Sequence, residues 1–228
     1  MSVLVVQHED ECPPALLGDW LVEAGVALDV RRPYADEALP SDLADHEGLV
    51  VLGGAMNANQ DGTHPWLAPT KDLIRAAARD DVPTLGVCLG HQLAAVALGG
   101  EVGRCPRGRQ IGVYDVGWTD AAATDPLFAG LASPRRAIQW NEDLVLTPPP
   151  GATLLAATAL DEVQALRFGP AMWGIQWHPE ATLEILTSWA ASEPGPAADA
   201  GLDAVRGAAV ELELAWRELG KAFAARLA

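Results

Sequence analysis

The sequence predicts an α/β fold in which a mostly parallel β-sheet is covered by helices. Short apolar runs rich in β-branched residues alternate with longer segments of helical periodicity through the first hundred residues, and this alternation is typical of βαβ units. Residues 2–7 (SVLVVQ) form the first of these runs, which suits a strand buried on both faces of a sheet. A chain of 228 residues is long enough for one such domain with a substantial core.

The first hundred residues contain the elements of the parallel part in alternation. Segments expected as strands are residues 2–7, 26–31, 48–52 and 83–87, and segments expected as helices are residues 13–24, 65–79 and 88–98. Pro13 and Gly25 support the bounds of the first helix, because proline is tolerated in a first turn and glycine is favoured just past a helix end. Leu67, Leu73 and Ile74 share one side of the second helix, as packing on a sheet requires.

Beyond Gly100 the expected strands are shorter and are separated by Gly, Pro and Trp. They are residues 111–118, 136–140, 153–157, 165–168 and 172–176. Several of their connections are too short to hold a crossover helix, so antiparallel pairing is expected among them. The sheet as a whole is therefore expected to be mixed.

The C-terminal region is expected to add a helix to a domain that spans residues 1–191. Residues 192–201 (SEPGPAADAG) are a linker by composition. In residues 202–228 apolar side chains recur at alternating spacings of three and four, which predicts an amphipathic helix. These side chains are Leu202, Val205, Ala209, Leu212, Trp216, Leu219 and Phe223. Amphipathic helices mostly cover a core, so packing on the same domain is expected, and a homodimer through the apolar stripe is the alternative.

The charge and cysteine content exclude several classes of protein. The chain has 31 Asp and Glu against 15 Lys and Arg, a formal net charge of -16 and a pI near 4.5. Such a field repels nucleic acid and anionic membrane surfaces. The 3 cysteines include no C-x-x-C pair, so neither a disulfide framework nor a metal site is expected, and no cofactor is expected either. The N-terminus lacks the basic segment of a signal peptide and no apolar run reaches about 18 residues, which favours a cytoplasmic protein.

The segment GVCLGHQ, residues 86–92, carries the strongest chemical signal. A strand that turns directly into a helix at G-x-C-x-G places Cys88 on a tight elbow, where flanking glycines avoid a clash. The helix N-terminus favours a thiolate there, and the amide of Leu89 is expected to stabilise an oxyanion. A free cysteine is more often a small buried apolar residue, and this interpretation is accepted for Cys12 and Cys105. For Cys88 the glycines and the strand end favour a nucleophile.

The segment WGIQWHPE, residues 173–180, supplies the partners that a thiol nucleophile needs. His178 is the candidate base and Glu180 its orienting carboxylate, with Pro179 stiffening the segment between them. His-Pro-Glu alone is more often a structural turn, and its weight comes from the presence of Cys88 in GVCLGHQ. The sequence therefore predicts a Cys-His-Glu triad.

Three motifs, GVCLGHQ, GIQWHPE and the upstream VLGGAM, together resemble the class I (triad-type) glutamine amidotransferase family, whose patterns are G-x-C-x-G-x-Q and H-P-E. The similarity covers residues 2–186. It implies a flavodoxin-like α/β fold with a mixed, mostly parallel sheet and helices on both faces. It also implies attack on the side-chain amide of glutamine, a γ-glutamyl thioester on Cys88, and release of glutamate and ammonia, with His178 and Glu180 completing the triad.

The resemblance also assigns residues around the triad. Gln92 corresponds to the family glutamine that contacts the substrate. Gly53 and Gly54 of VLGGAM match the glycine-rich oxyanion strand, where the amide of Gly54 joins that of Leu89. Taken alone, a Gly-Gly pair more often marks a tight turn. Met56 either walls the pocket or has a packing role.

The segment QWNED resembles the family region whose main chain holds the amino and carboxylate groups of glutamine. Trp140, Glu142 and Asp143 are therefore expected at the substrate. Asn141 stands where many relatives carry a histidine. Gln164 matches a position where glutamine is usual, and a structural role is expected for it.

Three functions remain open at this point. The resemblance favours a glutamine-hydrolysing protein similar to the amidotransferase part of GMP synthase, either free-standing or as one half of a two-chain enzyme. The chain has no length for a synthetase domain, so the ammonia acceptor is expected on a separate synthetase subunit. The alternative is a γ-glutamyl peptide or amide hydrolase with no ammonia acceptor. The third is a catalytically silent binding module of the same fold.

Overall fold

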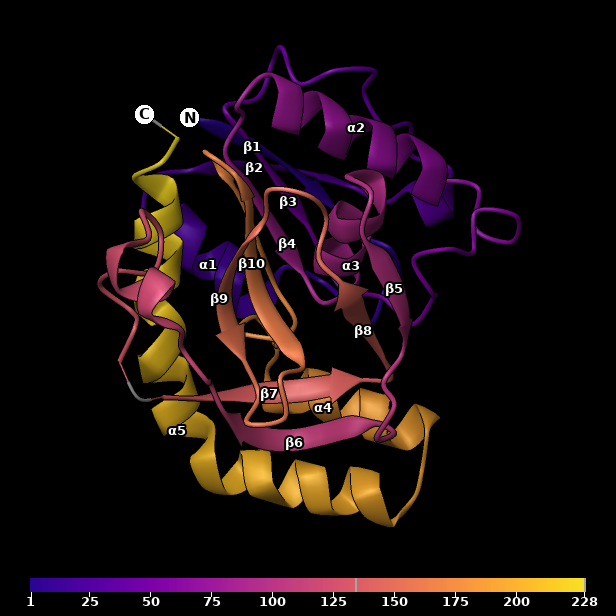
Figure 1. The fold of residues 1–228 in the computed structure, drawn as a ribbon. Helices are drawn as coiled ribbons and strands as arrows, with labels where there is room; N and C mark the ends of the chain where they lie inside the picture. The colour runs from indigo at the N-terminus through magenta and orange to yellow at the C-terminus, as the bar shows by residue number, and fades with distance from the viewer. Residues whose placement is uncertain (134, 228) are drawn as a thin grey trace.

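A computed structural model describes residues 1–133 and 135–227, and its centre is a seven-stranded sheet (Figure 1). In spatial order the strands are β2 (Ala27–Arg31), β1 (Ser2–Val6), β3 (Gly48–Val51), β4 (Thr84–Val87), β11 (Met172–Ile175), β10 (Val163–Gly169) and β9 (Thr153–Ala157). Neighbours from β2 to β11 pair in parallel, whereas β10 runs antiparallel to both β11 and β9. The mixed, mostly parallel sheet that the sequence predicts is confirmed.

The helices follow the strands in the order expected for an α/β protein. They are α1 (Ala15–Glu23), α2 (Leu67–Arg79), α3 (Leu89–Ala97), α4 (Leu183–Ser192) and α5 (Pro196–Ala224), with two short 3-10 turns, η1 (Pro33–Ala35) and η2 (Asp120–Thr124). The sequence does not predict α4. Among the helices of residues 1–133 and 135–227, none combines the length and the apolar character that crossing a bilayer requires.

Helices cover both faces of the sheet, and β1 shows how the sequence arranges this. Val3 and Val5 belong to a core cluster that includes residues of α1 and α5. Leu4 and Val6 belong to a second cluster, formed with residues of α2 and α3. Because side chains alternate between the faces of a strand, the uninterrupted apolar run of β1 contributes side chains to the core clusters on both faces of the sheet.

Two small antiparallel sheets flank the main sheet, and the sequence predicts only half of their strands. The first pairs β5 (Glu101–Arg104) with β8 (Asp143–Thr147), and the second pairs β6 (Gln110–Asp115) with β7 (Arg136–Asn141). The sequence predicts β6 and β7, but it misses β5 and β8. β5 is short and half polar, and β8 follows β7 after one residue, so no turn signal separates the two strands in the sequence.

The terminal helix is longer than the sequence predicts. α5 already begins at Pro196, so the expected linker at residues 192–201 shrinks to residues 193–195 between α4 and α5. Proline fits the first turn of a helix, and the residues that follow it do not oppose helix formation. α5 packs on this same chain: its first part lies beneath β6 and β7, and its second part runs beside α1 (Figure 1).

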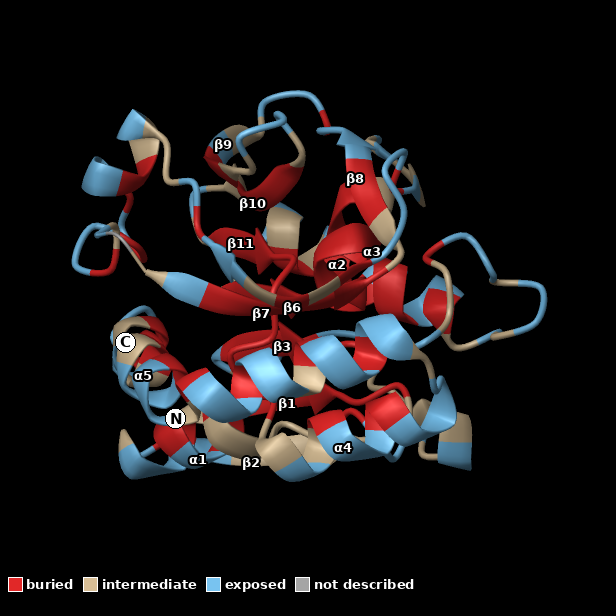
Figure 2. Cartoon of the chain, turned by 90° about the horizontal axis from the view of Figure 1, so that it is seen from below, coloured by how far each residue is buried: buried red, intermediate tan, exposed pale blue. Residues whose placement is uncertain are grey.

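The outer sides of α5 are exposed and its inner sides are buried, as Figure 2 shows from below. Gly201 of the first part lies against Gly112 of β6, and Gly220 of the second part lies against Trp20 of α1. The apolar stripe that the sequence identifies is thus used within the chain. A homodimer through this helix stays a prediction.

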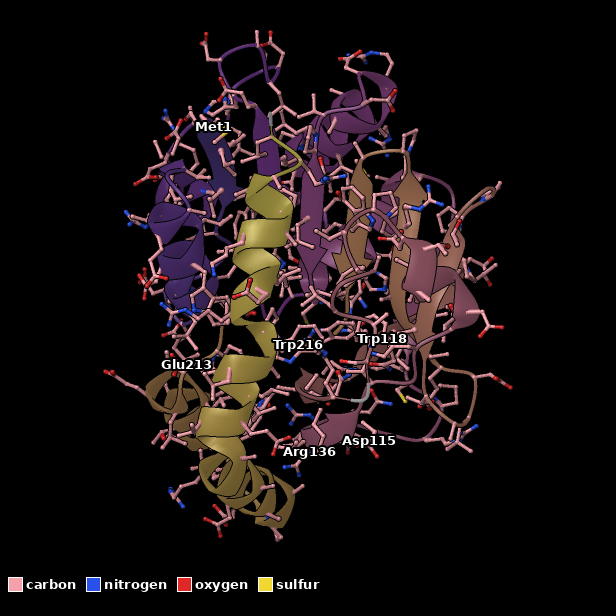
Figure 3. The ribbon with its side chains drawn as sticks, turned by 90° about the vertical axis from the view of Figure 1, so that its left-hand side faces the viewer. Met1, Asp115, Trp118, Arg136, Glu213 and Trp216 are labelled. Carbon is pink, nitrogen blue, oxygen red and sulfur yellow. The ribbon has the colours of Figure 1, made fainter. Side chains whose placement is uncertain are left out.

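Tryptophan side chains pack against one another at the junction between α5 and the main sheet. Trp216, labelled on α5 in Figure 3, lies with its ring centroid 5.0 Å from that of Trp177 and 6.3 Å from that of Trp118. The indole nitrogen of Trp216 donates a hydrogen bond to the carbonyl oxygen of Arg136 at 2.9 Å. The second part of α5 is therefore fastened both to the core and to β7.

Two buried histidines give the fold an expected sensitivity to acid. Burial lowers the pKa of His8 and of His91 from 6.5 to about 3. The unfolded chain takes up these protons near pH 6.5 and the folded chain does not, so stability is full above that pH and falls as the pH drops toward 3. At pH 5 each histidine is expected to remove about 2 kcal/mol from the free energy of unfolding.

Urea denaturation at pH 7 and pH 5 measures this effect. The variant His91→Leu is expected to lose about 2 kcal/mol less than the wild type between these two pH values. An equal loss in both proteins would contradict the assignment of His91 as a buried neutral group.

Candidate active site

Cys88 occupies a sharp elbow between β4 and α3. β4 ends at Val87 and α3 begins at Leu89, so Cys88 alone makes the turn, with φ 48° and ψ -102°. A positive φ is unfavourable for a residue that carries a Cβ. The structure thus has the tight elbow that the G-x-C-x-G pattern predicts.

The two flanking glycines allow this elbow to exist. A Cβ on Gly86 would lie 2.6 Å from the carbonyl carbon of Gly90, and a Cβ on Gly90 would overlap the carbonyl oxygen of Val51 on β3. The amide of Gly90 donates to the carbonyl oxygen of Leu52 at 3.1 Å. The start of α3 therefore rests directly on the backbone of the neighbouring strand.

His178 and Glu180 lie beside Cys88 because β11 pairs in parallel with β4. Ile175 lies opposite Val87, so the chain leaves both strands at the same edge of the sheet. The Nδ1 of His178 lies 2.7 Å from the Oε1 of Glu180, and each residue is 2% exposed. The carboxylate accepts, so Nδ1 is the donor.

Gly53 brings the histidine and the cysteine together. A Cβ at this position would lie 3.1 Å from the Cε1 of His178 and 3.7 Å from the Cβ of Cys88. The main chain around His178 is held from two sides, because its amide donates to Ile138 of β7 and the amide of Leu16 in α1 donates to the carbonyl oxygen of Glu180. These contacts hold the pair next to the elbow.

The charges around His178 favour its protonated form. Burial opposes protonation, but the carboxylate of Glu180, and the sulfur of Cys88 after it, raise the pKa of His178 above its ordinary value. Within the described residues, the Nε2 of His178 has no hydrogen-bond partner. The histidine therefore has one nitrogen fixed by Glu180, and its other nitrogen carries the proton that these charges favour.

A cavity of about 520 Å³ opens onto Cys88 and His178. Of the residues predicted around the substrate, it is lined by Gly54, Met56, Gln92, Trp140, Glu142 and Asp143. Gly53, Leu89 and Glu180 are not among its lining residues: Gly53 backs the cysteine and the histidine, and Glu180 contacts His178. The structure thus gathers the predicted residues around one site.

Gly54 and Leu89, whose amides are expected to form an oxyanion hole, are neighbours in the structure. A Cβ on Gly54 would lie 3.0 Å from the side chain of Leu89 and 2.6 Å from the sulfur of Met56, so a larger residue here would displace these two side chains. Among protein groups of the described chain, no acceptor takes a hydrogen bond from the amide of Gly54 or of Leu89. Ala55 is fixed next to them by donating its amide to Glu9 at 3.0 Å.

The cavity is also lined by residues that the sequence did not predict as site residues, among them Cys12, which was expected to be only a small buried apolar residue. They are Glu9, Glu11 and Cys12 after β1, Ala55, Asn57 and Gln60 after β3, Arg104, Arg109 and Asn141 around the small sheets, and Ser188, Trp189, Ser192 and Glu193 at the end of α4. The carboxyl ends of parallel strands commonly form ligand sites, so the position of the acidic residues directly after β1 was a signal that they could line the site. The arginines carry no local signal of this kind.

Opposite charges line the outer part of the cavity. Arg104 contacts Glu142 and lies with its Nε 3.6 Å from Asp143, and Arg109 pairs with Glu193 and lies 3.5 Å from Glu142. Charged groups of both signs at one cavity can bind a compound that carries both an ammonium and a carboxylate group.

The remaining histidines do not join this site. His91 is fully buried on α3, next to the ring of Phe168 and the backbone of Gly174. His8 is fully buried beside Gly54. In the described part of the chain, no group of three or more His, Cys, Asp or Glu side chains is arranged to hold a metal ion.

The fold and the site define an α/β domain with a cysteine at a strand–helix elbow and a His–Glu pair at the end of the adjacent strand. The chain belongs to the class I glutamine amidotransferase family, since the model of that family, Glutamine amidotransferase class-I, matches residues 15–188.

Several relatives are similar over most of this chain. It is 31% identical over 191 residues to the glutamine amidotransferase-like protein YfeJ of Salmonella typhimurium, a match that covers 81% of this chain and 77% of that one. It is 35% identical to a subunit of the glutamine-hydrolyzing GMP synthase of Halobacterium salinarum, over 68% of this chain and 76% of that one. It is 33% identical to gamma-glutamyl peptidase 4 of Arabidopsis thaliana, over 64% of this chain and 58% of that one.

A solved structure confirms the fold independently. The crystal structure of a glutamine amidotransferase from Thermotoga maritima superposes with a TM-score of 0.85 at 24% identity, covering 98% of both chains. At this level of identity the likeness concerns the fold alone, including the mixed sheet with helices on both faces.

Proposed function

We propose that this protein hydrolyses the γ-amide of glutamine through a thioester on Cys88, giving glutamate and ammonia. The observation that carries this proposal is the junction at Gly53, where the elbow cysteine and the His178–Glu180 pair meet at the base of one cavity. The family to which the chain belongs supports the choice of an amide substrate.

The first half of the proposed reaction forms the thioester. The Nε2 of His178 takes the thiol proton, and the sulfur of Cys88 attacks the δ-carbon of glutamine. The negative charge on the amide oxygen is stabilised by the amides of Gly54 and Leu89. His178 then gives its proton to the amide nitrogen, the carbon–nitrogen bond breaks, and ammonia leaves. Glu180 holds the imidazole in place and stabilises its charged form throughout.

The second half of the reaction releases glutamate. His178 removes a proton from a water molecule, whose oxygen attacks the thioester carbon. The carbon–sulfur bond breaks, the electron pair returns to the sulfur of Cys88, and the proton on His178 restores the thiol. One water is consumed for each glutamate and ammonia formed, so the enzyme returns to its starting state.

The substrate is proposed to bind through the charged groups of the cavity. Its α-amino group would lie near the acidic side chains of Glu142 and Asp143, with Trp140 and Gln92 at the side of the carbon chain. Ammonia would pass to a separate synthetase subunit, as the relation to one subunit of a GMP synthase suggests.

A γ-glutamyl peptide or amide is the second candidate substrate. A cavity of about 520 Å³ falls within the range of sites that hold drug-sized molecules, and the likeness to gamma-glutamyl peptidase 4 points in the same direction. The intermediate on Cys88 would be the same, and only the leaving group would differ.

Product release from the two substrates tests these proposals. The wild type is expected to release ammonia from glutamine, and Cys88→Ala is expected to release none above background. Faster release of amine from a γ-glutamyl dipeptide would favour the second candidate.

A second measurement does not require turnover, so it also tests an enzyme that is inactive without its synthetase. A glutamine analogue with a chloromethyl ketone in place of the amide is expected to alkylate Cys88, detected as a mass increase on the peptide that contains it. A folded protein that neither releases product nor reacts at Cys88 would instead be a silent binding module.

A further inference from the structure

A glutamine side chain contacts the sulfur of Cys88. The Nε2 of Gln176 lies 3.4 Å from that sulfur and donates a hydrogen bond to it. Gln176 follows the last residue of β11, and it is fully buried, with 0% of its surface exposed. The family resemblance assigns no role to this residue.

A second glutamine fixes which end of the Gln176 amide faces the sulfur. The Nε2 of Gln92 donates to the carbonyl oxygen of Asp143 at 2.9 Å and to the Oε1 of Gln176 at 3.2 Å. A backbone carbonyl can only accept, so Gln92 must present its nitrogen there. Gln176 therefore turns its oxygen toward Gln92, and its nitrogen is left for the sulfur.

We propose that Gln176 is a catalytic residue that donates a hydrogen bond to the thiolate of Cys88, and that Gln92 is a positioning residue that holds the Gln176 amide in this orientation. The proposal deepens the proposed function, because it rests on Cys88 being the nucleophile. It gives Gln92 a task besides the substrate contact that the sequence predicts.

The hydrogen bond acts at the two points of the reaction where sulfur carries negative charge. When His178 takes the thiol proton, the charged sulfur accepts a stronger hydrogen bond than the thiol did. In the thioester the sulfur is neutral and the bond weakens. When the carbon–sulfur bond breaks during hydrolysis, the electron pair returns to a sulfur that again faces the Gln176 donor. Both the formation and the departure of the thiolate are thereby assisted.

Other titratable groups face the sulfur and must stay unchanged in a test. Those near the elbow are Cys12 with Glu9 after β1, and His178 with Glu180 after β11. Glu11 also lines the cavity. The outer cavity adds Arg104, Arg109, Glu142, Asp143 and Glu193. A substitution of neutral Gln176 by a neutral residue leaves all of these charges in place.

Alkylation of Cys88 by iodoacetamide measures thiolate formation without any substrate. Its rate is followed from about pH 5 to about pH 10 by mass spectrometry of the peptide that contains Cys88. In Gln176→Met, which keeps the length of the side chain, the pH midpoint is expected to rise by about one pH unit, since one hydrogen bond to a charged group is lost. Gln176→Glu is expected to raise it further, because a carboxylate next to the sulfur repels the thiolate.

Matched variants separate this role from general packing. Gln164→Met removes another buried amide from the adjacent strand β10, and it is expected to leave the midpoint unchanged. Gln92→Met is expected to raise the midpoint by less than Gln176→Met, because the freed Gln176 amide still reaches the sulfur part of the time. Thermal denaturation of each variant shows whether it is folded.

An unchanged midpoint in folded Gln176→Met and folded Gln176→Glu would overturn the proposal, and so would an equal rise in Gln164→Met. The outcome is distinct from that of the proposed function. A raised midpoint in a protein that hydrolyses neither glutamine nor a γ-glutamyl dipeptide, and whose Cys88 does not react with the chloromethyl ketone analogue of glutamine, would support the role of Gln176 and would contradict the proposed activity.

Discussion

Glu180→Gln is expected to lower kcat for glutamine hydrolysis by about 10³-fold or more, with KM changed only a few-fold. Glutamine has the same shape as glutamate, so the packing around His178 is kept. The carboxylate that accepts from Nδ1 at 2.7 Å and raises the pKa of His178 is lost. In the proposed reaction, the imidazolium that forms when Cys88 gives up its proton then lacks its buried counter-charge, and the wrong tautomer becomes accessible.

The loss should appear in kcat because Glu180 contacts His178 and is not among the residues that line the cavity. Steady-state measurement of ammonia release over a range of glutamine concentrations separates the two constants. Glu211→Gln, on the exposed side of α5 where it pairs with Arg136, makes the same chemical change and is expected to behave as the wild type. Equal kcat values for Glu180→Gln and the wild type would exclude Glu180 from the triad.

Gly90→Ala is expected to reduce the free energy of unfolding by about 4 kcal/mol or more, or to prevent folding. The new Cβ would overlap the carbonyl oxygen of Val51 and lie 2.7 Å from its carbon. Both are backbone atoms of a central strand, so no side-chain rotation relieves the overlap. Moving α3 away would break the hydrogen bond from Gly90 to Leu52 and shift Cys88.

Gly207 provides a matched control, because the same substitution there is expected to increase the free energy of unfolding. Gly207 lies in the exposed middle of α5, and a Cβ added there would meet no atom within 4 Å. Gly207→Ala is therefore expected to stabilise the protein by about 0.5–1 kcal/mol through helix propensity. Urea denaturation of the two variants measures both effects. Similar stability of Gly90→Ala and the wild type would mean that α3 does not depend on its close contact with β3.

The parallel half of the fold could be predicted because its strands are buried on both faces. An uninterrupted apolar run such as β1 stands out against the helical periodicity around it, and the bounds of β3 and β4 differ from the predicted ones by one residue at an end. The small sheets were harder to predict from the sequence. β5 has two charged residues in four, and its pairing with β8 depends on chain proximity that no local pattern encodes.

The candidate site shows a similar division. Motifs with fixed spacing predicted Cys88, His178 and Glu180 as site residues, because an elbow and a strand end restrict which residues can stand there, and the structure places the three close together. Arg104 ends β5 and Arg109 precedes β6, so both line the cavity through the placement of the small sheets, which no local sequence pattern encodes. Gln176 lies within the motif GIQWHPE, but the sequence did not predict its contact with the sulfur of Cys88. That contact depends on the hydrogen bond from Gln92, which lies 84 residues away in the chain and is close only in the folded structure.

The elbow at Cys88 also has a consequence for how this protein tolerates change. A positive φ in a sparsely populated region costs a residue with a Cβ about 1–3 kcal/mol, and here it falls on the residue proposed to do the chemistry, with φ 48°. The surrounding packing must offset that cost for as long as the chain is folded. Glycine at this position would relax the backbone but remove the thiol, so the residue that best suits the local conformation and the residue that can react are different ones.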